Sequence, residues 1–135
     1  MTATLDVVDV AQTIPLDARL RAPWSWESTP EHAFEELGTI QWGEASYDFN
    51  QTAVFRHKDT GTLFIASDSG CSCPSPFEDT TVRDATVIHH LRDFDAVIDG
   101  QRNSEWAWER ERATYPPTVD SIARVRKAVE EALRR

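Results

Sequence analysis

The sequence is short of cysteine and of long apolar runs. Its only cysteines, Cys71 and Cys73, are one residue apart. A disulfide across so short a loop would be strained, so we expect reduced thiols and not a secreted disulfide scaffold. The longest apolar run is roughly four residues, far below the ~20 of a membrane-spanning helix. The first residues also lack the pattern of a secretion signal. We therefore expect a cytoplasmic protein outside the membrane.

Basic charge is scarce as well. The chain carries 23 acidic and 14 basic residues, a net charge of −9, with the acidity concentrated in residues 1–100. This balance argues against unspecific binding to nucleic acid or anionic lipid through a basic surface. It serves solubility, or it matches a basic partner or mimics a nucleic-acid backbone. Arginine outnumbers lysine 12 to 2, which is typical of GC-rich genomes such as those of actinobacteria and their phages.

Motifs of the common nucleotide-binding and metallohydrolase classes are missing: GxGxxG, GxxxxGK[ST] and HExxH do not occur. Cys71 as a nucleophile is disfavoured because the acidic residues Asp68, Glu78 and Asp79 oppose a thiolate. A carboxylate pair of Asp68 with Glu78 or Asp79 is a further catalytic possibility, although acids lie close together by chance in so acidic a chain. The sequence favours a non-catalytic protein over an enzyme.

With 135 residues, 40% of them apolar, the chain is long enough for a single domain with one core. We expect an extended arm over 1–28, an α/β body over 29–100 and C-terminal helices over 101–135. In the body, Thr29 as N-cap and Gly38 as the closing residue predict a short helix over 30–37. Two β-rich runs joined by the turn 58–61, which ends in glycine, predict a central hairpin covered on both faces.

Beyond the hairpin, residues 67–76 predict a structured loop and 76–79 a single helical turn. The run 86–91 predicts a strand. Asp93 is expected to cap a helix that either continues to Tyr115 or breaks before Ser104, and we favour the break. The prolines Pro116 and Pro117 are expected to end this element. Thr118 is then expected to cap a final helix with apolar residues at helical spacing, namely Val119, Ile122, Val125, Val129, Ala132 and Leu133. Together these elements predict an α+β fold: a small antiparallel sheet with a central hairpin and helices packed on one face.

Four residues resemble a metal site: Cys71, Cys73, His89 and His90. Thiolates and imidazoles are the usual zinc ligands, and four close a tetrahedral shell. Their spacing is not a standard one, and adjacent histidines on a strand face opposite sides. His57 is a possible substitute ligand. The alternative is that the two thiols pack as small apolar groups under the loop.

Tryptophans occur in two pairs, Trp24 with Trp26 and Trp106 with Trp108. Side chains two positions apart on a helix cannot both face the core, so one ring of each pair is expected at the rim or exposed. Exposed tryptophan beside arginine, here Arg110, is typical of a contact surface. The alternative is that the rings close irregular edges of a small core.

The run 47–49, the turn 58–61 and above all the string SDSGCSCPSPFE at 67–78 resemble a small family of uncharacterised proteins encoded by actinobacterial tailed phages. The resemblance covers roughly residues 39–100. It implies a phage origin and a host-cell setting, and it implies no reaction.

From these observations we expect a non-catalytic phage accessory protein that binds and modulates a host or defence macromolecule in the host cytoplasm. Its binding residues would be the four tryptophans and Arg110, and no cofactor is expected. The alternative is a small zinc-binding module, structural or hydrolytic, centred on Cys71 and Cys73. A homodimer through the C-terminal helix is possible, although packing of this helix on its own sheet explains its apolar stripe equally well.

Overall fold

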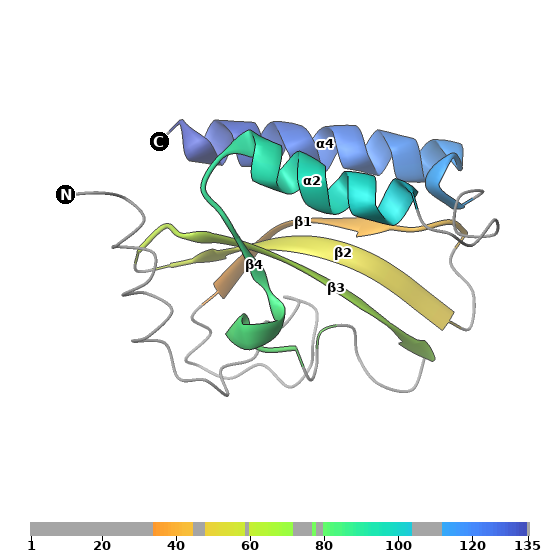
Figure 1. Cartoon of the computed structure of the whole chain (residues 1–135), viewed down its shortest axis with the longest axis horizontal. Helices are drawn as coiled ribbons and strands as arrows, with labels where there is room; N and C mark the ends of the chain where they lie inside the picture. The colour runs from red at the N-terminus through yellow and green to blue at the C-terminus, as the bar shows by residue number, and fades with distance from the viewer. Residues whose placement is uncertain are drawn as a thin grey trace.

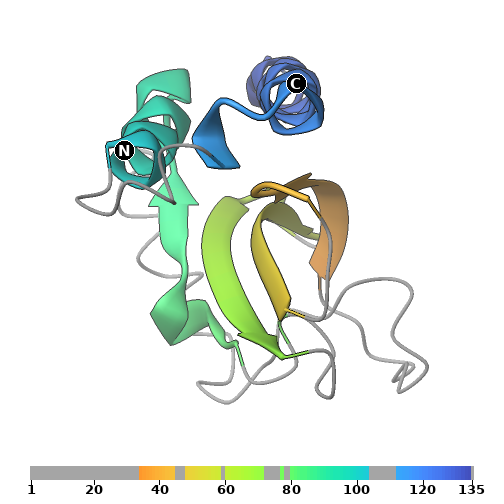
Figure 2. The ribbon, with the colours of Figure 1, turned by 90° about the vertical axis from the view of Figure 1, so that its right-hand side faces the viewer.

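The computed structural model describes residues 34–44, 48–58, 60–71, 77, 80–103 and 112–134. These residues form an antiparallel sheet of four strands with two long helices, α2 and α4, on one side of it (Figure 1). Figure 2 looks along the two helices and shows both on the same side of the curved sheet. The predicted α+β class, with an antiparallel sheet and helices on one face, is confirmed.

The strands follow one another in space as they do in the chain. They are β1 (Phe34–Gln41), β2 (Asp48–His57), β3 (Leu63–Cys71) and the short β4 (Thr86–Ile88), in the order β1-β2-β3-β4. The predicted hairpin is therefore central, because β2 and β3 are the inner pair. Its turn closes where the Gly61 N–H donates to the His57 carbonyl at 2.8 Å. Gly61 adopts φ +78°, a conformation that glycine takes without steric cost.

The helix predicted over 30–37 is wrong for the described residues, since 34–37 belong to β1. Cross-strand pairing outweighs the local capping signals: Phe34 lies opposite His57, and its ring meets the Phe64 ring edge-on at 5.7 Å. The register shifts between Glu36 and Gly38, which is a β-bulge. Gly38 thus lies inside the strand and ends no helix.

Both faces of the sheet are apolar, as alternation along β2 and β3 predicted. Toward the helices, one buried cluster joins sheet and helix residues: Ile40, Trp42, Val54, Leu63, Ile65, Ile88, Phe94, Ile98, Ala113, Ile122, Val125 and Val129. The opposite face carries a second, aromatic-rich cluster: Phe34, Ala53, Phe55, Phe64, Ala66, Phe77 and Val82.

The described part of the segment between β3 and α2 differs from the prediction. Phe77 has φ +64°, which is incompatible with the right-handed helical turn predicted over 76–79. A 3-10 turn, η1 (Val82–Asp84), follows, and Thr81 and Asp84 cap it reciprocally. The strand predicted over 86–91 ends at Ile88, because the next residues turn into α2.

Helix α2 (Leu91–Arg102) begins earlier than predicted. Its N-cap is His90, and Asp93 is the third helical residue, whose Oδ2 accepts the backbone N–H groups of His89 and His90, both at 2.9 Å. A carboxylate at this position satisfies donors that the first turn leaves free, so it acts as a cap from inside the helix. The helix ends at Arg102, as the favoured break before Ser104 predicted.

Helix α4 (Pro116–Leu133) starts with the two prolines that were expected to end the preceding element. Proline suits the first helical positions, because the backbone N–H that it lacks has no partner there. Thr118 is consequently inside the first turn and does not cap the helix. Its buried hydroxyl donates to the Gln41 carbonyl at 2.7 Å and accepts the Gly43 N–H at 2.9 Å. These two hydrogen bonds connect the start of α4 to the end of β1. Of the predicted stripe, Ile122, Val125 and Val129 are buried, whereas Val119 is exposed.

Candidate functional site

The helix-facing side of the central hairpin changes from apolar to polar along its length. Beside the turn end, Val54 pairs with Ile65 in the buried cluster. The next pair on this face is Thr52 with Ser67, and the one after it is Asn50 with Ser69. Since side chains alternate along a strand, this face continues the core as a row of hydroxyl and amide groups.

Helix α2 shows the same change from apolar to polar side chains along its length. Phe94 and Ile98 are buried, and Gln101 follows Ile98 by three residues, so it lies on the same side of the helix. Its Nε2 donates to Ser67 Oγ at 3.3 Å. The end of α2 is therefore joined to β3 by a hydrogen bond at the position where apolar packing stops.

Ser67 is one end of a hydrogen-bonded chain that reaches into the core. The buried Trp42 Nε1 donates to Thr52 Oγ1 at 2.8 Å, and Thr52 Oγ1 lies 2.8 Å from Ser67 Oγ. Thr52 is fully buried, whereas Ser67 is exposed. A buried polar network of this kind holds its members in fixed orientations, so the position of the Ser67 hydroxyl is set from inside the protein.

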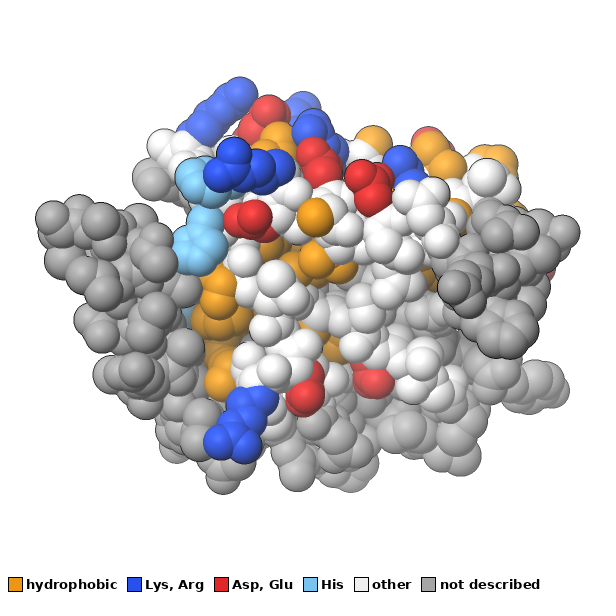
Figure 3. Space-filling view, in the orientation of Figure 1, with side chains coloured by type: hydrophobic (Ala, Val, Ile, Leu, Met, Phe, Trp, Pro, Cys, Tyr) orange, Lys and Arg blue, Asp and Glu red, His pale blue; other side chains and the backbone are white. Residues whose placement is uncertain are grey.

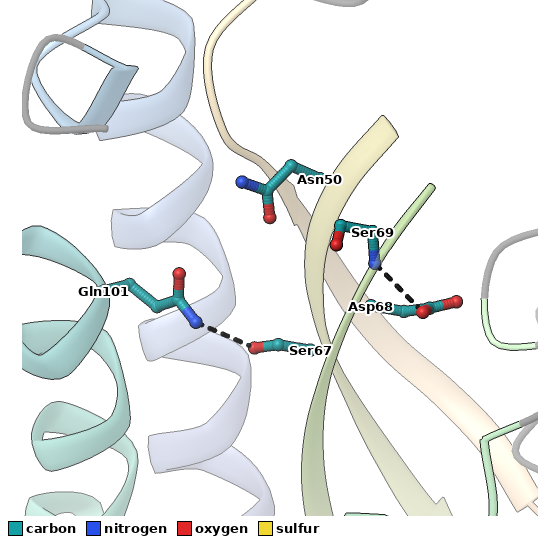
Figure 4. Close-up of a pocket in the computed structure, with 5 residues that line it drawn as sticks. All are labelled: Asn50, Ser67, Asp68, Ser69 and Gln101. Atoms are coloured by element: carbon teal, nitrogen blue, oxygen red, sulfur yellow. Dashed lines mark hydrogen bonds between the residues drawn. The ribbon is translucent and has the colours of Figure 1, made fainter. Parts of the chain in front are cut away.

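These polar groups line a pocket of about 300 Å³ formed by Asn50, Ser67, Asp68, Ser69 and Gln101. Figure 4 shows Gln101 reaching from α2 toward Ser67, with Asn50 and Ser69 standing on the neighbouring strands. Four of the five described lining residues carry neutral hydrogen-bonding side chains. In Figure 3, polar side chains and backbone cover most of the surface between α2 and β3, and charged side chains lie along α2. The pocket is thus a polar hollow at the open end of the helix–sheet layer.

Asp68, the one charged side chain among the described lining residues, is directed to the other side of β3 (Figure 4). Its Oδ1 accepts the Ser69 N–H at 2.9 Å and its Oδ2 accepts the Phe77 N–H at 2.8 Å. Both carboxylate oxygens therefore accept hydrogen bonds from backbone N–H groups, and Asp68 has a structural role. Its proposed catalytic partners, Glu78 and Asp79, lie outside the described residues.

Carboxylates with displaced pKa values lie away from the pocket lining, and each has a structural cause. Burial raises the pKa of Glu36, which also accepts a hydrogen bond from Thr39 Oγ1. The backbone N–H groups of His90 and His89 lower the pKa of Asp93. The bidentate hydrogen bond from Arg126 lowers the pKa of Asp95. Perturbed acids mark catalytic sites only when they gather in a cleft, and these three do not gather.

The strand register separates Cys71 from the histidines of the predicted zinc site. Only the backbone of Cys71 is described, at the far end of β3. His89 and His90 follow Ile88, which pairs with Leu63 at the start of β3. A strand of this length separates its ends by about 26 Å, whereas zinc–ligand bonds are about 2 Å. Cys71 and the two histidines therefore do not form one metal site in this fold.

Of the other two zinc candidates, only His57 can be placed. Cys73 lies outside the described residues. His57 is buried at the hairpin turn, where its Nδ1 lies 3.0 Å from Thr60 Oγ1 and its ring packs edge-on against Phe34. Within the described residues, no group of three or more histidine, cysteine or acidic side chains is placed to hold a metal ion.

The predicted contact residues Trp24, Trp26, Trp106, Trp108 and Arg110 all lie outside the described residues. Their role in binding stays a prediction. The described helices include none that is long and apolar enough to cross a membrane.

A comparison of the sequence with known protein families identifies the family of this chain. A family model described as "Domain of unknown function (DUF7574)" matches residues 25–134. The chain belongs to this family. Searches of curated proteins and of solved structures found no match. Membership of the DUF7574 family agrees with the expectation of an uncharacterised family, and the matched region, residues 25–134, covers most of the chain.

Sequence reasoning missed the pocket of this DUF7574 member, although a signal was present. The patterns Asn50-x-Thr52 and Ser67-x-Ser69 place small polar groups at alternate positions that continue the apolar Val54 and Ile65. When the register of the hairpin is known, this alternation places the polar side chains on the same face as the core and next to it. The contribution of Gln101 needs the docking of α2, which local patterns do not specify.

Proposed function

We propose that this DUF7574 protein is a non-catalytic phage accessory protein that binds and modulates a host or defence macromolecule in the host cytoplasm. The observation that carries the proposal is the chemistry of the pocket. Asn50, Ser67, Ser69 and Gln101 offer neutral donors and acceptors, and Asp68 is occupied by backbone N–H groups. Such a lining orients a polar group of a partner without supplying a general acid, a base or an activated nucleophile.

The phage origin rests on the resemblance of the 67–78 string to proteins of actinobacterial tailed phages. The pocket begins within that string, at Ser67, Asp68 and Ser69. The part of the chain that carries the resemblance therefore also supplies one wall of the pocket. A net charge of −9 adds long-range attraction to a basic partner surface.

Trp106, Trp108 and Arg110 supply a second contact region in this proposal. They follow α2 closely in the chain, and α2 brings Gln101 to the pocket. Large aromatic and arginine side chains contribute most of the energy of many protein interfaces. In this proposal, the pocket would orient a polar group of the partner, and the aromatic side chains would bury area on the same partner.

The experiment is a quantitative affinity capture from an actinobacterial host lysate. The bait is the full chain as wild type, as the pocket variant Asn50→Ala/Gln101→Ala, and as the control Asp99→Ala at an exposed position of α2. We expect one partner that wild type and control retain equally. The pocket variant should retain it about tenfold less, which corresponds to roughly 1.4 kcal/mol of binding free energy.

Circular dichroism and thermal unfolding of all three baits show whether the variants remain folded. Equal retention of every captured protein by wild type and pocket variant would contradict the proposal. So would turnover of a substrate by the purified chain. Sedimentation of the purified protein tests the remaining partner, a second copy of the chain.

A further inference from the structure

We infer that the pocket lined by Asn50, Ser67, Ser69 and Gln101 recognises a neutral carboxamide, presented by an asparagine or glutamine side chain of a protein partner. This inference deepens the proposed function and rests on it, because it names the chemical group that the pocket takes. Three observations support it: the direction of the Ser67 hydroxyl, the charge of the lining and the placement of the two amides.

The hydrogen-bonded chain directs the Ser67 proton. An indole N–H only donates, so Thr52 Oγ1 is the acceptor for Trp42 Nε1. The geometry allows either hydroxyl to donate across the 2.8 Å between Thr52 Oγ1 and Ser67 Oγ. Thr52 is taken as the donor because its hydroxyl is fully buried and has no other acceptor among the described residues. Gln101 Nε2 donates to the same Ser67 oxygen. With both acceptor positions of Ser67 Oγ filled, its O–H is left to donate into the pocket, where a carbonyl oxygen can accept it.

The charges of the lining favour a neutral guest. No cation is among the described residues that line the pocket, and Arg112, which lines a smaller neighbouring space with Asn50 and Gln101, is already engaged in an interaction. A cation entering the pocket would find the Asp68 carboxylate directed away and already hydrogen-bonded. A charged group that loses water without gaining an ion pair pays a large desolvation cost. The net charge of −9 further opposes phosphate-bearing guests.

The two lining amides face the pocket from different elements, Asn50 from β2 and Gln101 from α2 (Figure 4). Each carboxamide has one donor and one acceptor group in a plane, so it pairs edge to edge with a carboxamide guest. A volume of about 300 Å³ is at the lower limit of small-molecule pockets and is large enough to admit one side chain.

The test is a ¹H–¹⁵N NMR titration of the full chain with two probes of equal shape. N-acetyl-glutamine methylamide carries the carboxamide, and N-acetyl-glutamate methylamide carries a carboxylate in its place. We expect the glutamine probe to shift the backbone signals of Ser67 and Ser69 and the side-chain NH₂ signals of Asn50 and Gln101. A dissociation constant on the order of millimolar is expected for so small a guest, and the glutamate probe should bind about tenfold more weakly.

Four variants localise the effect. Ser67→Ala should weaken binding of the glutamine probe roughly 3- to 10-fold, the range of one hydrogen bond. Gln101→Glu adds a charge and removes the Nε2 donors at the pocket, and it should abolish the preference for the amide. Ala96→Glu adds the same charge at an exposed position of α2 and should bind as wild type does. Ser69→Ala, at an exposed site, is the second hydroxyl variant if Ser67→Ala fails to fold.

Equal binding of both probes would overturn the inference, as would shifts confined to other residues or unchanged binding by Ser67→Ala and Gln101→Glu. Stronger binding of a methyl glycoside or of an uncharged nucleoside would also overturn it. The two proposals fail separately. If the amide probe binds but the lysate yields no pocket-dependent partner, the proposed function is wrong. If a partner needs the pocket but the probes do not bind, the carboxamide inference is wrong.

Discussion

Replacing Gly38 by alanine tests how closely α4 packs on β1. A Cβ at Gly38 would lie 2.8 Å from Val125 Cγ2, whereas carbon atoms in contact normally lie about 3.5–4.0 Å apart. Val125 is buried between helix and sheet, so its side chain or the backbone must shift to admit the new Cβ. Overpacking of this kind costs about 1–3 kcal/mol. Alanine also lowers the conformational entropy of the unfolded chain, which stabilises the folded state by about 0.4–1 kcal/mol. We expect Gly38→Ala to lower the free energy of unfolding by roughly 1–2 kcal/mol.

The double-mutant cycle with Val125→Ala separates this clash from a backbone effect. Val125→Ala alone should cost about 2 kcal/mol through lost apolar burial and a cavity beside Gly38. In the double variant the new Cβ occupies part of that cavity, so the combined loss should be smaller than the sum by roughly 1–2 kcal/mol. The measurement is urea unfolding followed by circular dichroism. Additivity within about 0.5 kcal/mol would refute the close-packing explanation.

Three further substitutions test contacts at the helix ends and between the helices. Thr118→Val should lower the free energy of unfolding by about 2–4 kcal/mol, because it leaves a buried N–H and a carbonyl of the β1 end unpaired; Thr118→Ser is the matched control in urea unfolding. The pKa of Asp93 is lowered in the folded state, so its contribution to stability is full above its usual pKa and lost as the pH falls through the folded value. Urea midpoints of wild type and Asp93→Asn should therefore differ at neutral pH and converge in acid. Asp95→Asn breaks an exposed ion pair with Arg126 and should have a smaller effect than Thr118→Val, one that about 1 M salt removes.

The strands could be predicted where pattern and turn agreed. Along β2 and β3, alternating apolar residues and a glycine-terminated turn both specify a hairpin, and the register confirms it. At β1 the local sequence signals and the long-range contacts disagreed. Local signals from Thr29 to Gly38 describe a helix, whereas the ring of Phe34 packs on Phe64 only when this segment is extended. A contact between residues thirty positions apart is not contained in any local window, so tertiary pairing decides the structure there.

The predicted starts of the two helices were wrong for a related reason. Asp93 and Thr118 are good capping residues by type, and both lie in the first turn of a helix instead of before it. Asp93 bonds backbone N–H groups from within the helix. The Thr118 hydroxyl bonds the end of β1 and not its own helix. Residue type correctly indicated an unsatisfied backbone group nearby, but which backbone it serves depends on how the elements dock.

The pocket and the core are parts of one continuous surface, and this explains why sequence reasoning found the core alone. Apolar periodicity identifies Val54, Ile65 and Ile98, since burial requires it. The same face continues into Thr52, Ser67 and Gln101, where no periodic apolar signal remains. Thr52 belongs to both regions: it is fully buried like a core residue, yet its hydroxyl connects Trp42 to the pocket. A fully buried hydroxyl must be hydrogen-bonded to be tolerated, so folding itself holds the Ser67 hydroxyl at the pocket. Packing of α2 on the sheet and orientation of the pocket therefore depend on the same side chains, and a change that loosens one loosens the other.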